Sequence, residues 1–155
     1  MEKLKELGID KNTVILYTSD NGSWLGYGID GGSAGPLRGG KRSAYEGGFR
    51  VPGIFHWPGK IPAGQVTSEP ISNMDVLPTF THLAGAQVPV DRTIDGHNIW
   101  PLLAGQAGAK SPYKHFYYFM GSSPGSKPNI AAIRQGKWKL HVKWEDETKN
   151  HLKVV

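Results

Sequence analysis

A glycine-rich stretch between two short apolar runs is the feature that most constrains this 155-residue chain. Residues 21–50 hold ten of its 21 glycines and show no helical or strand periodicity. The flanking runs, residues 13–20 and 51–58, are apolar and read as strands. A loop of this length inside a compact domain is usually functional, so we expect a loop-borne site between two strands.

The elements around this loop predict an α/β fold. We read 13–20 as a buried parallel strand whose polar end opens onto the site. We expect helices over 2–8 and 75–85, and a turn with a short helix over 94–106. Strands are predicted over 115–120 and 130–142, the second folding into a hairpin at Gln135-Gly136. We therefore expect an α/β domain over 1–110 and a small antiparallel subdomain over 111–155.

Composition excludes several classes of function. The net charge is +5, but the basic residues form no compact stripe, so we expect no nucleic-acid partner. No apolar run approaches the ~20 residues of a membrane span, and the charged first ten residues have no signal-peptide core. The chain has no cysteine and therefore no thiolate site. A group of lysines toward the C-terminus is expected to be a solvated face: Lys137, Lys139, Lys143, Lys149 and Lys153.

The segment from Gly35 to Lys41 fits GxxxxGK, most of a nucleotide-binding phosphate loop. Such a loop needs a strand directly before it, Ser or Thr after the lysine, and a helix starting there. Here Arg42 follows the lysine, and the preceding strand ends at Asp20, 15 residues before Gly35. We therefore reject the phosphate-loop interpretation.

Asp20 and Asn21 lie where the first predicted strand ends. A carboxylate beside an amide carbonyl offers the hard oxygen ligands that Ca²⁺ or Mg²⁺ prefers. Asp-Asn-Gly is also strong turn chemistry, and residues 21–23 form a glycosylation sequon. Local sequence alone leaves the metal ligand and the turn both open.

Four ordered blocks together are more specific: "TVILYTSDNG", "GGSAGPLRGGKRSAYEGGFRVPGIFHWPGKI", "NMDVLPTFTHLAGA" and "IDGHNIWPLLAGQ". They resemble the C-terminal portion of the type I sulfatases, the arylsulfatase and N-acetylgalactosamine-6-sulfatase-like members of the alkaline phosphatase superfamily. The resemblance implies part of an alkaline-phosphatase-like mixed sheet flanked by helices. It also implies that Asp20 and Asn21 ligate a divalent cation, usually Ca²⁺ with Mg²⁺ possible. Lys41 would be the catalytic residue that contacts the sulfate ester, and Arg38 a second candidate for binding it.

Other residues of these blocks have structural interpretations. Tyr45 to Gly48 are expected to shape the loop, with Glu46 pairing with Arg42 or Arg50. No spacing groups the histidines at 56, 82 and 97, so we expect each to be structural. Asp75 is predicted to cap the helix over 75–85, and Asp95 to lie in a turn.

The sequence also departs from the family pattern. The C/S-x-P-S-R motif that yields the formylglycine nucleophile is absent; in sulfatases it lies in the N-terminal half. We therefore expect a chain that is inactive alone, and either self-association or a partner chain carrying that half. Two alternatives remain: a phosphate or phosphonate monoester hydrolase of the same superfamily, and a non-catalytic sulfated-glycan-binding or complementation module. Family members are commonly secreted, periplasmic or lysosomal, which leaves the compartment open.

Overall fold

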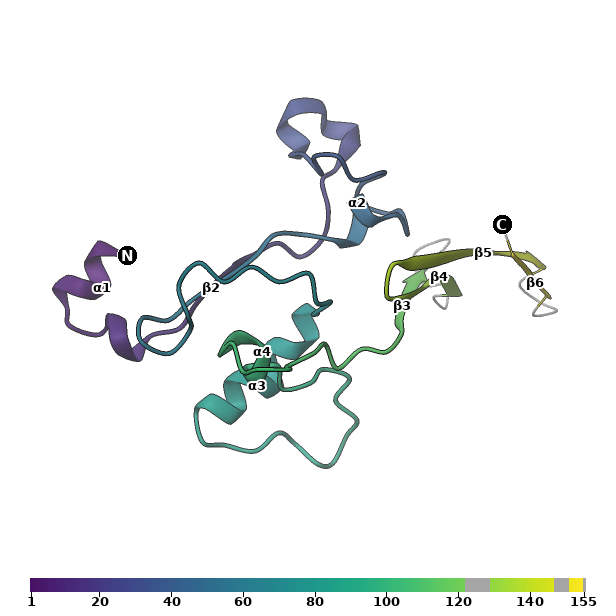
Figure 1. Cartoon of the computed structure of the whole chain (residues 1–155). Coiled ribbons are helices and arrows are strands. Elements are labelled where there is room, and N and C mark those ends of the chain that lie inside the picture. Colours follow the sequence, from purple (N-terminus) through teal and green to yellow (C-terminus); the bar gives the residue numbers. More distant parts are fainter. Residues whose placement is uncertain (122–128, 147–150, 155) are drawn as a thin grey trace. The chain divides into compact units, whose positions relative to one another are not determined.

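The structure is a computed structural model that describes residues 1–121, 129–146 and 151–154 (Figure 1). The chain divides into two compact units. Unit 1 comprises Met1–Thr18 and Gly53–Tyr113, and unit 2 comprises Ser19–Pro52 and Lys114–Val155. Each unit is therefore built from two separate segments of sequence. The predicted domain boundary near residue 110 stays a prediction, and the prediction for Lys149 lies outside the described residues.

Unit 1 contains a two-stranded sheet. Strands β1 (Ile15–Thr18) and β2 (Gly53–His56) pair antiparallel, with Tyr17 opposite Ile54. Both strands were predicted. The prediction that 13–20 is a parallel strand is wrong among the described residues, where β1 pairs antiparallel with β2. An apolar run indicates that both faces of a strand can be covered; it carries no information on the direction of the neighbouring strand.

The helical elements of unit 1 are short and are connected by loops. They are α1 (Glu2–Glu6), the 3-10 turns η1 (Asp10–Asn12) and η3 (Asn73–Asp75), α3 (Val76–Leu83) and α4 (Trp100–Leu103). These confirm helical structure within all three segments where we expected it. Gly85, with a φ of +71°, follows α3 as the sequence suggested.

Asp75 occupies the N-cap position of α3, as predicted, but its side chain makes no capping hydrogen bond there, and the side-chain cap of the helical segment is Ser72. The Ser72 hydroxyl accepts a hydrogen bond from Met74 N at 3.2 Å, and Asp75 accepts one from Ser72 N at 2.8 Å. The two residues form a reciprocal capping box at the start of η3, which continues directly into α3. The helical segment therefore starts at Asn73.

Asp75 and Thr79 are buried and link α3 to the segment that precedes α4. Asp75 accepts hydrogen bonds from His97 N at 2.8 Å and from the Tyr113 hydroxyl. Thr79 accepts one from Ile99 N at 3.0 Å. Polar groups inside a protein are stabilising only when paired in this way, so these two side chains join distant parts of unit 1.

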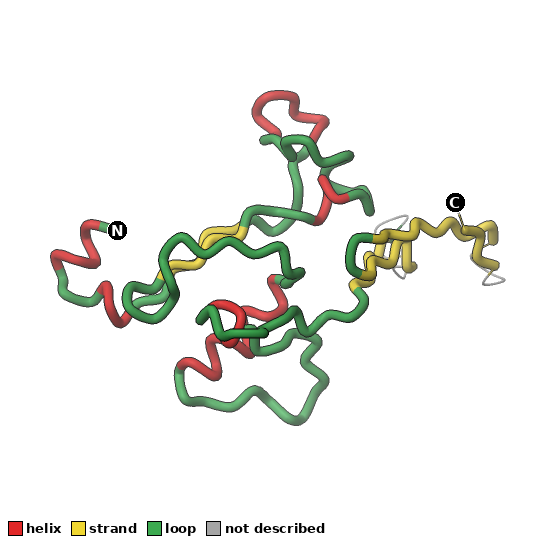
Figure 2. Tube along the Cα trace, in the orientation of Figure 1, coloured by secondary structure: helices red, strands yellow, loops and turns green. Residues whose placement is uncertain are grey.

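Unit 2 contains the glycine-rich loop and an antiparallel sheet. The loop includes η2 (Leu25–Gly31) and the one-turn helix α2 (Glu46–Phe49). The sheet has the order β3-β4-β5-β6, formed by Phe116–Met120, Asn129–Gln135, Trp138–Asp146 and His151–Val154 (Figure 2). The predicted hairpin is confirmed, because Gln135 pairs with Trp138 and Gly136 takes a φ of +54° in the two-residue turn.

The two faces of this sheet differ. Cross-strand pairing places Tyr118, Ala132 and His141 in one row, with Arg134 and Lys139 beside them on the same face. α2 packs against this face, since the rings of Phe49 and Tyr118 lie 4.8 Å apart. The opposite face carries exposed apolar side chains, including Tyr117, Phe119, Trp138 and Leu140.

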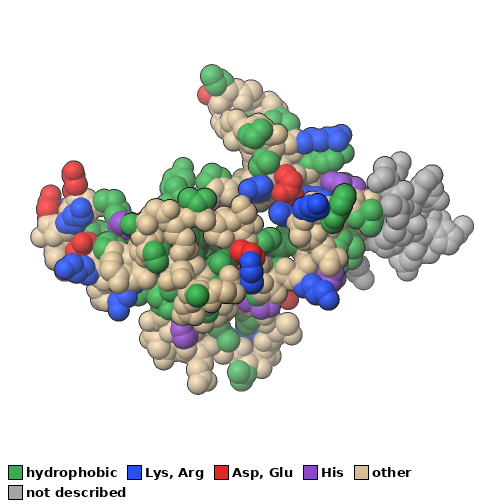
Figure 3. Space-filling view, in the orientation of Figure 1, with side chains coloured by type: hydrophobic (Ala, Val, Ile, Leu, Met, Phe, Trp, Pro, Cys, Tyr) green, Lys and Arg blue, Asp and Glu red, His purple; other side chains and the backbone are tan. Residues whose placement is uncertain are grey.

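Few apolar side chains are buried in the described residues. They are Ile99, Leu102, Leu103, Tyr118, Ala132 and Val142. Many large apolar side chains are instead exposed, and Figure 3 shows hydrophobic side chains scattered over the visible surface. In the described part of the chain, no helix is long and apolar enough to cross a membrane.

Candidate functional site

Backbone hydrogen bonds join the start of the glycine-rich loop to its later part. Gly22 N donates to Gly48 O at 3.0 Å, and Lys41 N donates to Ser23 O at 2.7 Å. The predicted metal ligands at positions 20 and 21 are therefore held beside the block that carries the predicted sulfate-binding lysine. These residues belong to one unit of the fold.

Glycines make this close packing possible. A Cβ on Gly22 would lie 1.8 Å from Gly47 O, and one on Gly40 would lie 2.4 Å from Ser23 O. A Cβ on Gly47 would lie 2.2 Å from Gly39 O. Such separations are far below any van der Waals contact, so these positions require glycine for steric reasons. The run of glycines is explained by backbones that touch, not by a phosphate cradle.

Asp20 and Asn21 follow β1 in a local hydrogen-bonded turn. Asp20 Oδ1 accepts from Asn21 N at 2.9 Å and from Ser19 Oγ at 3.4 Å. Asp20 is exposed and Asn21 half-buried. Among the described residues, no three His, Asp or Glu side chains are grouped to hold a metal ion. A bend with local side-chain hydrogen bonds is therefore present at Asp20 and Asn21, and within the described part of the chain no third acidic or histidine ligand lies with this oxygen pair.

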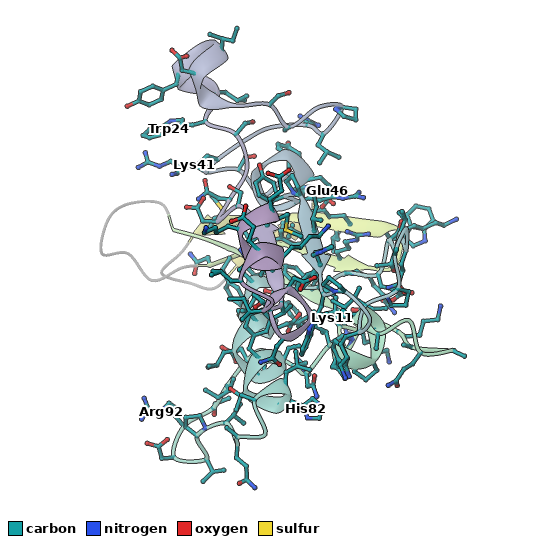
Figure 4. The ribbon with its side chains drawn as sticks, turned by 90° about the vertical axis from the view of Figure 1, so that its left-hand side faces the viewer. Lys11, Trp24, Lys41, Glu46, His82 and Arg92 are labelled. Atoms are coloured by element: carbon teal, nitrogen blue, oxygen red, sulfur yellow. The ribbon has the colours of Figure 1, made fainter. Side chains whose placement is uncertain are left out.

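Lys41 is half-buried beside an aromatic ring. Its Nζ lies 4.9 Å from the centroid of the Trp24 ring, and Figure 4 shows the two side chains next to each other. The next residue, Arg42, has a φ of +69°, which is uncommon outside glycine. A strained backbone beside a half-buried cation is typical of functional loops.

Arg38 lies over the ring of Tyr45, with Cζ 4.0 Å from the ring centroid. The Tyr45 ring also contacts His141 of the C-terminal sheet, and the two ring centroids lie 4.7 Å apart. Gly47 N donates to Arg38 O at 2.8 Å, which fixes the backbone of this part of the loop. Arg38 is thus an exposed cation ordered by stacking on an aromatic face.

The predicted pairing of Glu46 with Arg42 or Arg50 is wrong. Glu46 pairs instead with residues of the C-terminal sheet. Its carboxylate accepts from Lys139 Nζ at 2.8 Å and from the Tyr118 hydroxyl at 3.0 Å. Arg134 Nη1 lies 3.4 Å from the same carboxylate. The prediction of a solvated face is therefore wrong for Lys139, whose side chain is only 13% exposed.

The titration of this cluster follows from its contacts. Burial raises the pKa of Glu46, but the combined effect of Lys139, Tyr118 and Arg134 exceeds it, so the pKa lies below its usual value. Burial and the neighbouring Glu46 carboxylate raise the pKa of Tyr118 to about 12. Glu46 is therefore ionised and Tyr118 protonated at neutral pH, which matches a carboxylate accepting from a hydroxyl.

Sequence reasoning missed the four sheet residues that face the loop: Tyr118, Arg134, Lys139 and His141. The alternation of polar and apolar side chains along 138–142 was the available signal. It shows that Lys139 and His141 share a face. It does not show which loop that face meets, because the contact joins residues 93 positions apart.

Comparisons with known proteins identify the family of this chain. A family model named Sulfatase matches residues 1–86, and the chain belongs to the sulfatase family. It is 45% identical to arylsulfatase D of Homo sapiens over 146 residues, which is 91% of this chain and 24% of that protein. The chain thus spans about a quarter of the length of this relative.

Solved structures show the same fold. The chain is similar to Ps i-CgsB in complex with k-i-k-neocarrahexaose, with a TM-score of 0.77 and 37% identity over 99% of this chain and 32% of that one. It is also similar to BT4656 in complex with its substrate D-glucosamine-2-N,6-O-disulfate, with a TM-score of 0.72 and 32% identity over 99% and 29% of the two chains. The predicted α/β fold class of the alkaline phosphatase type is confirmed.

Proposed function

We propose that this chain is the C-terminal, metal- and sulfate-binding portion of a sulfuric ester hydrolase. One observation carries the proposal: in a member of the sulfatase family, the Asp20–Ser23 turn is hydrogen-bonded to the loop that bears Lys41. This juxtaposition supports a site where a cation and a lysine act on the same anion.

Each residue has a distinct role in this proposal. Asp20 and Asn21 would donate oxygens to Ca²⁺, or to Mg²⁺, and the chemistry of both side chains fits a hard cation. Lys41 would bind a sulfate oxygen as a point charge. Arg38 would be a second cation for the substrate. Neutralising the oxygens of a sulfate ester makes its sulfur easier to attack and its leaving group easier to release.

The site is incomplete within this chain. Two oxygen ligands fall short of the 6–8 that Ca²⁺ takes, and the sequence has no formylglycine motif. In the family, formylglycine supplies the nucleophilic oxygen. We infer that the rest of a longer protein, or a partner chain, provides the nucleophile and the other metal ligands. The chain alone would be inactive.

The proposed substrate is a sulfate monoester on a sugar or an aryl group. A relative is an arylsulfatase, and one structural neighbour was solved with a disulfated glucosamine. The match to sulfatases supports a sulfate ester over the phosphate or phosphonate esters that the superfamily resemblance left open. The exposed apolar side chains support a covering partner, either a second copy or a chain carrying the remaining part of the enzyme.

Ligand titration of the 155-residue chain tests the proposal. We expect weak binding of inorganic sulfate, lost in Lys41→Ala and retained in Lys60→Ala, a matched change at an exposed lysine of unit 1. We expect weak Ca²⁺ binding, lost in Asp20→Ala and retained in Asp10→Ala. Sulfate binding that is indifferent to Lys41→Ala would refute the site. Enzyme-like hydrolysis of an aryl sulfate that Lys41→Ala abolishes would refute the inactivity of the chain alone.

A further inference from the structure

A second group of nitrogen-bearing side chains lies in the same unit as Lys41. The proposed function uses Arg38 from this group only as a second cation for the substrate, and it does not use His141. Arg38 stacks on Tyr45 at 4.0 Å, and His141 contacts the same ring with centroids 4.7 Å apart. The Tyr45 ring thus contacts two nitrogen-bearing side chains, one from the loop and one from β5. The contact brings together residues that are far apart in the sequence.

The charges around Tyr45 are unbalanced. The cations nearby are Arg38, Arg134 and Lys139, and Glu46 is the acidic group in contact with Arg134 and Lys139. Glu46 is already engaged by Lys139 and Arg134. The positive charge of Arg38 is therefore left facing solvent on an exposed side chain, which favours an anionic ligand there.

The state of His141 agrees with this excess of positive charge. Burial, Lys139 and Arg38 lower the pKa of His141, and Glu46 opposes them more weakly. The imidazole is consequently neutral at neutral pH in the free chain, and it can donate one N–H to an anion. An anion placed beside it would favour the imidazolium form.

The spacing along the loop relates this group to Lys41. Arg38 and Lys41 are three residues apart, and the backbone between them is fixed at both ends by hydrogen bonds to Gly47 N and Ser23 O. The two cations therefore belong to one short piece of the loop whose backbone is held by hydrogen bonds at both ends.

We propose that Arg38 and His141, joined through Tyr45, form a second anion subsite that binds a sulfate or carboxylate group of the same sugar whose sulfate ester contacts Lys41. The substrate class is thus a sugar with at least two anionic groups. The inference rests on the proposed function, because it takes Lys41 as the site of the first sulfate. In this inference Arg38 binds a neighbouring anionic group of the substrate and not the reacting sulfate ester.

The test compares two probes on the 155-residue chain: glucosamine 6-sulfate and glucosamine 2-N,6-O-disulfate. Each is titrated calorimetrically into wild type, Arg38→Ala, His141→Gln and Lys41→Ala. The matched control is Arg50→Ala, which removes the same charge from another exposed arginine of the loop. We expect the disulfated sugar to bind about tenfold more tightly, corresponding to about 1.4 kcal/mol. This preference should disappear in Arg38→Ala and shrink in His141→Gln, and it should survive in Arg50→Ala.

The outcomes separate this inference from the function on which it rests. If both sugars bind equally in wild type, with binding lost in Lys41→Ala, the subsite is refuted and the proposed function stands. If the preference is unchanged in Arg38→Ala, the subsite is also refuted. If neither sugar binds to wild type, both proposals fail.

A measurement on wild type alone guards against variants that fail to fold. Proton NMR of the His141 imidazole, followed against pH, reports its pKa with and without the disulfated sugar. The groups that face His141 are Tyr45, Arg38, Lys139 and Glu46. We expect saturation with the disulfated sugar to raise the pKa of His141, because an anion stabilises the imidazolium, and the monosulfated sugar to raise it less. An unchanged pKa at saturation with the disulfated sugar would overturn the proposal.

Discussion

Glu46 Oε1 accepts a hydrogen bond from Lys139 Nζ at 2.8 Å, and this contact joins the loop that carries Lys41 to strand β5. Tyr118 and Arg134 contact the same carboxylate. The Lys139 side chain is 13% exposed and that of Glu46 is 26% exposed, so the pair is only partly screened by water. The C-terminal sheet thus acts as a support for the loop.

Glu46→Gln is expected to destabilise the chain in a pH-dependent way. The pKa of Glu46 is lowered on folding, so its contribution is complete above the ordinary value of 4.5 and is lost as pH falls through the lowered folded-state value. At neutral pH we expect a loss of about 1 kcal/mol, discounted for the exposure of the carboxylate. Urea unfolding from pH 3 to 7 measures the difference between the two proteins.

That difference should close at the acidic end, where wild type also carries a protonated Glu46. The matched control is Glu2→Gln, at an exposed position of α1, which should unfold like wild type across the range. A gap between wild type and Glu46→Gln that stays constant down to pH 3 would show that the carboxylate charge is not what stabilises the loop.

Asp75→Ala should be the most damaging of the changes considered in unit 1. The buried carboxylate accepts hydrogen bonds from Ser72 N, His97 N and the Tyr113 hydroxyl, and its removal takes this shared acceptor away from all three donors. We expect a loss of about 3 kcal/mol or more in the free energy of unfolding, measured by denaturant titration. Asp91→Ala, at an exposed ion pair with Arg92, should change little. Equal effects of the two changes would contradict the role given to Asp75.

Adding a methyl group should have opposite effects at two glycines. Gly47→Ala would place a Cβ 2.2 Å from Gly39 O, so we expect a loss of about 1–3 kcal/mol and weaker sulfate binding through displacement of the Lys41 loop. Gly53→Ala in β2 meets no atom within 4 Å and should be neutral, or stabilising by up to about 1 kcal/mol. Thermal unfolding and sulfate titration check both effects. Similar destabilisation by the two changes would refute the steric argument.

The exposed apolar side chains predict self-association of the chain when no partner is present. Tyr17 and Ile54 face each other across β1 and β2 with 65% and 59% of their surface exposed. We expect sedimentation velocity to show concentration-dependent association, reduced in Ile54→Lys because a charge on this face resists burial. Val66→Lys changes an isolated residue that is 93% exposed and should have no such effect. A monomer at all concentrations would overturn the prediction.

Features that depend on local sequence could be predicted. The strand ending before Asp20, the helix ended by Gly85 and the hairpin at Gly136 each follow from residues within a few positions of one another. A functional site was also predicted on the glycine-rich loop, and this stays a prediction. The steric need for glycine in this loop could not be predicted, because the carbonyl oxygens that exclude a Cβ come from other segments.

Features that depend on distant contacts could not be predicted. The partners of Glu46 lie 72 to 93 residues further along the chain, and nothing nearby distinguishes them from Arg42 or Arg50. The direction of β1 relative to β2 is likewise a property of the pair and not of either strand. Asp75 looked like an ordinary cap because its bonds to His97 N and the Tyr113 hydroxyl are invisible in the local pattern.

The separation between Glu46 and Lys139 also sets the order of events during synthesis. Lys139 is the 93rd residue that the ribosome adds after Glu46, and this synthesis takes roughly 5–20 s at typical rates of translation. Throughout that interval the nascent loop has its glycines but not its support. Until Lys139 has been synthesised, the loop that bears Lys41, the proposed sulfate-binding residue, lacks its contact with β5.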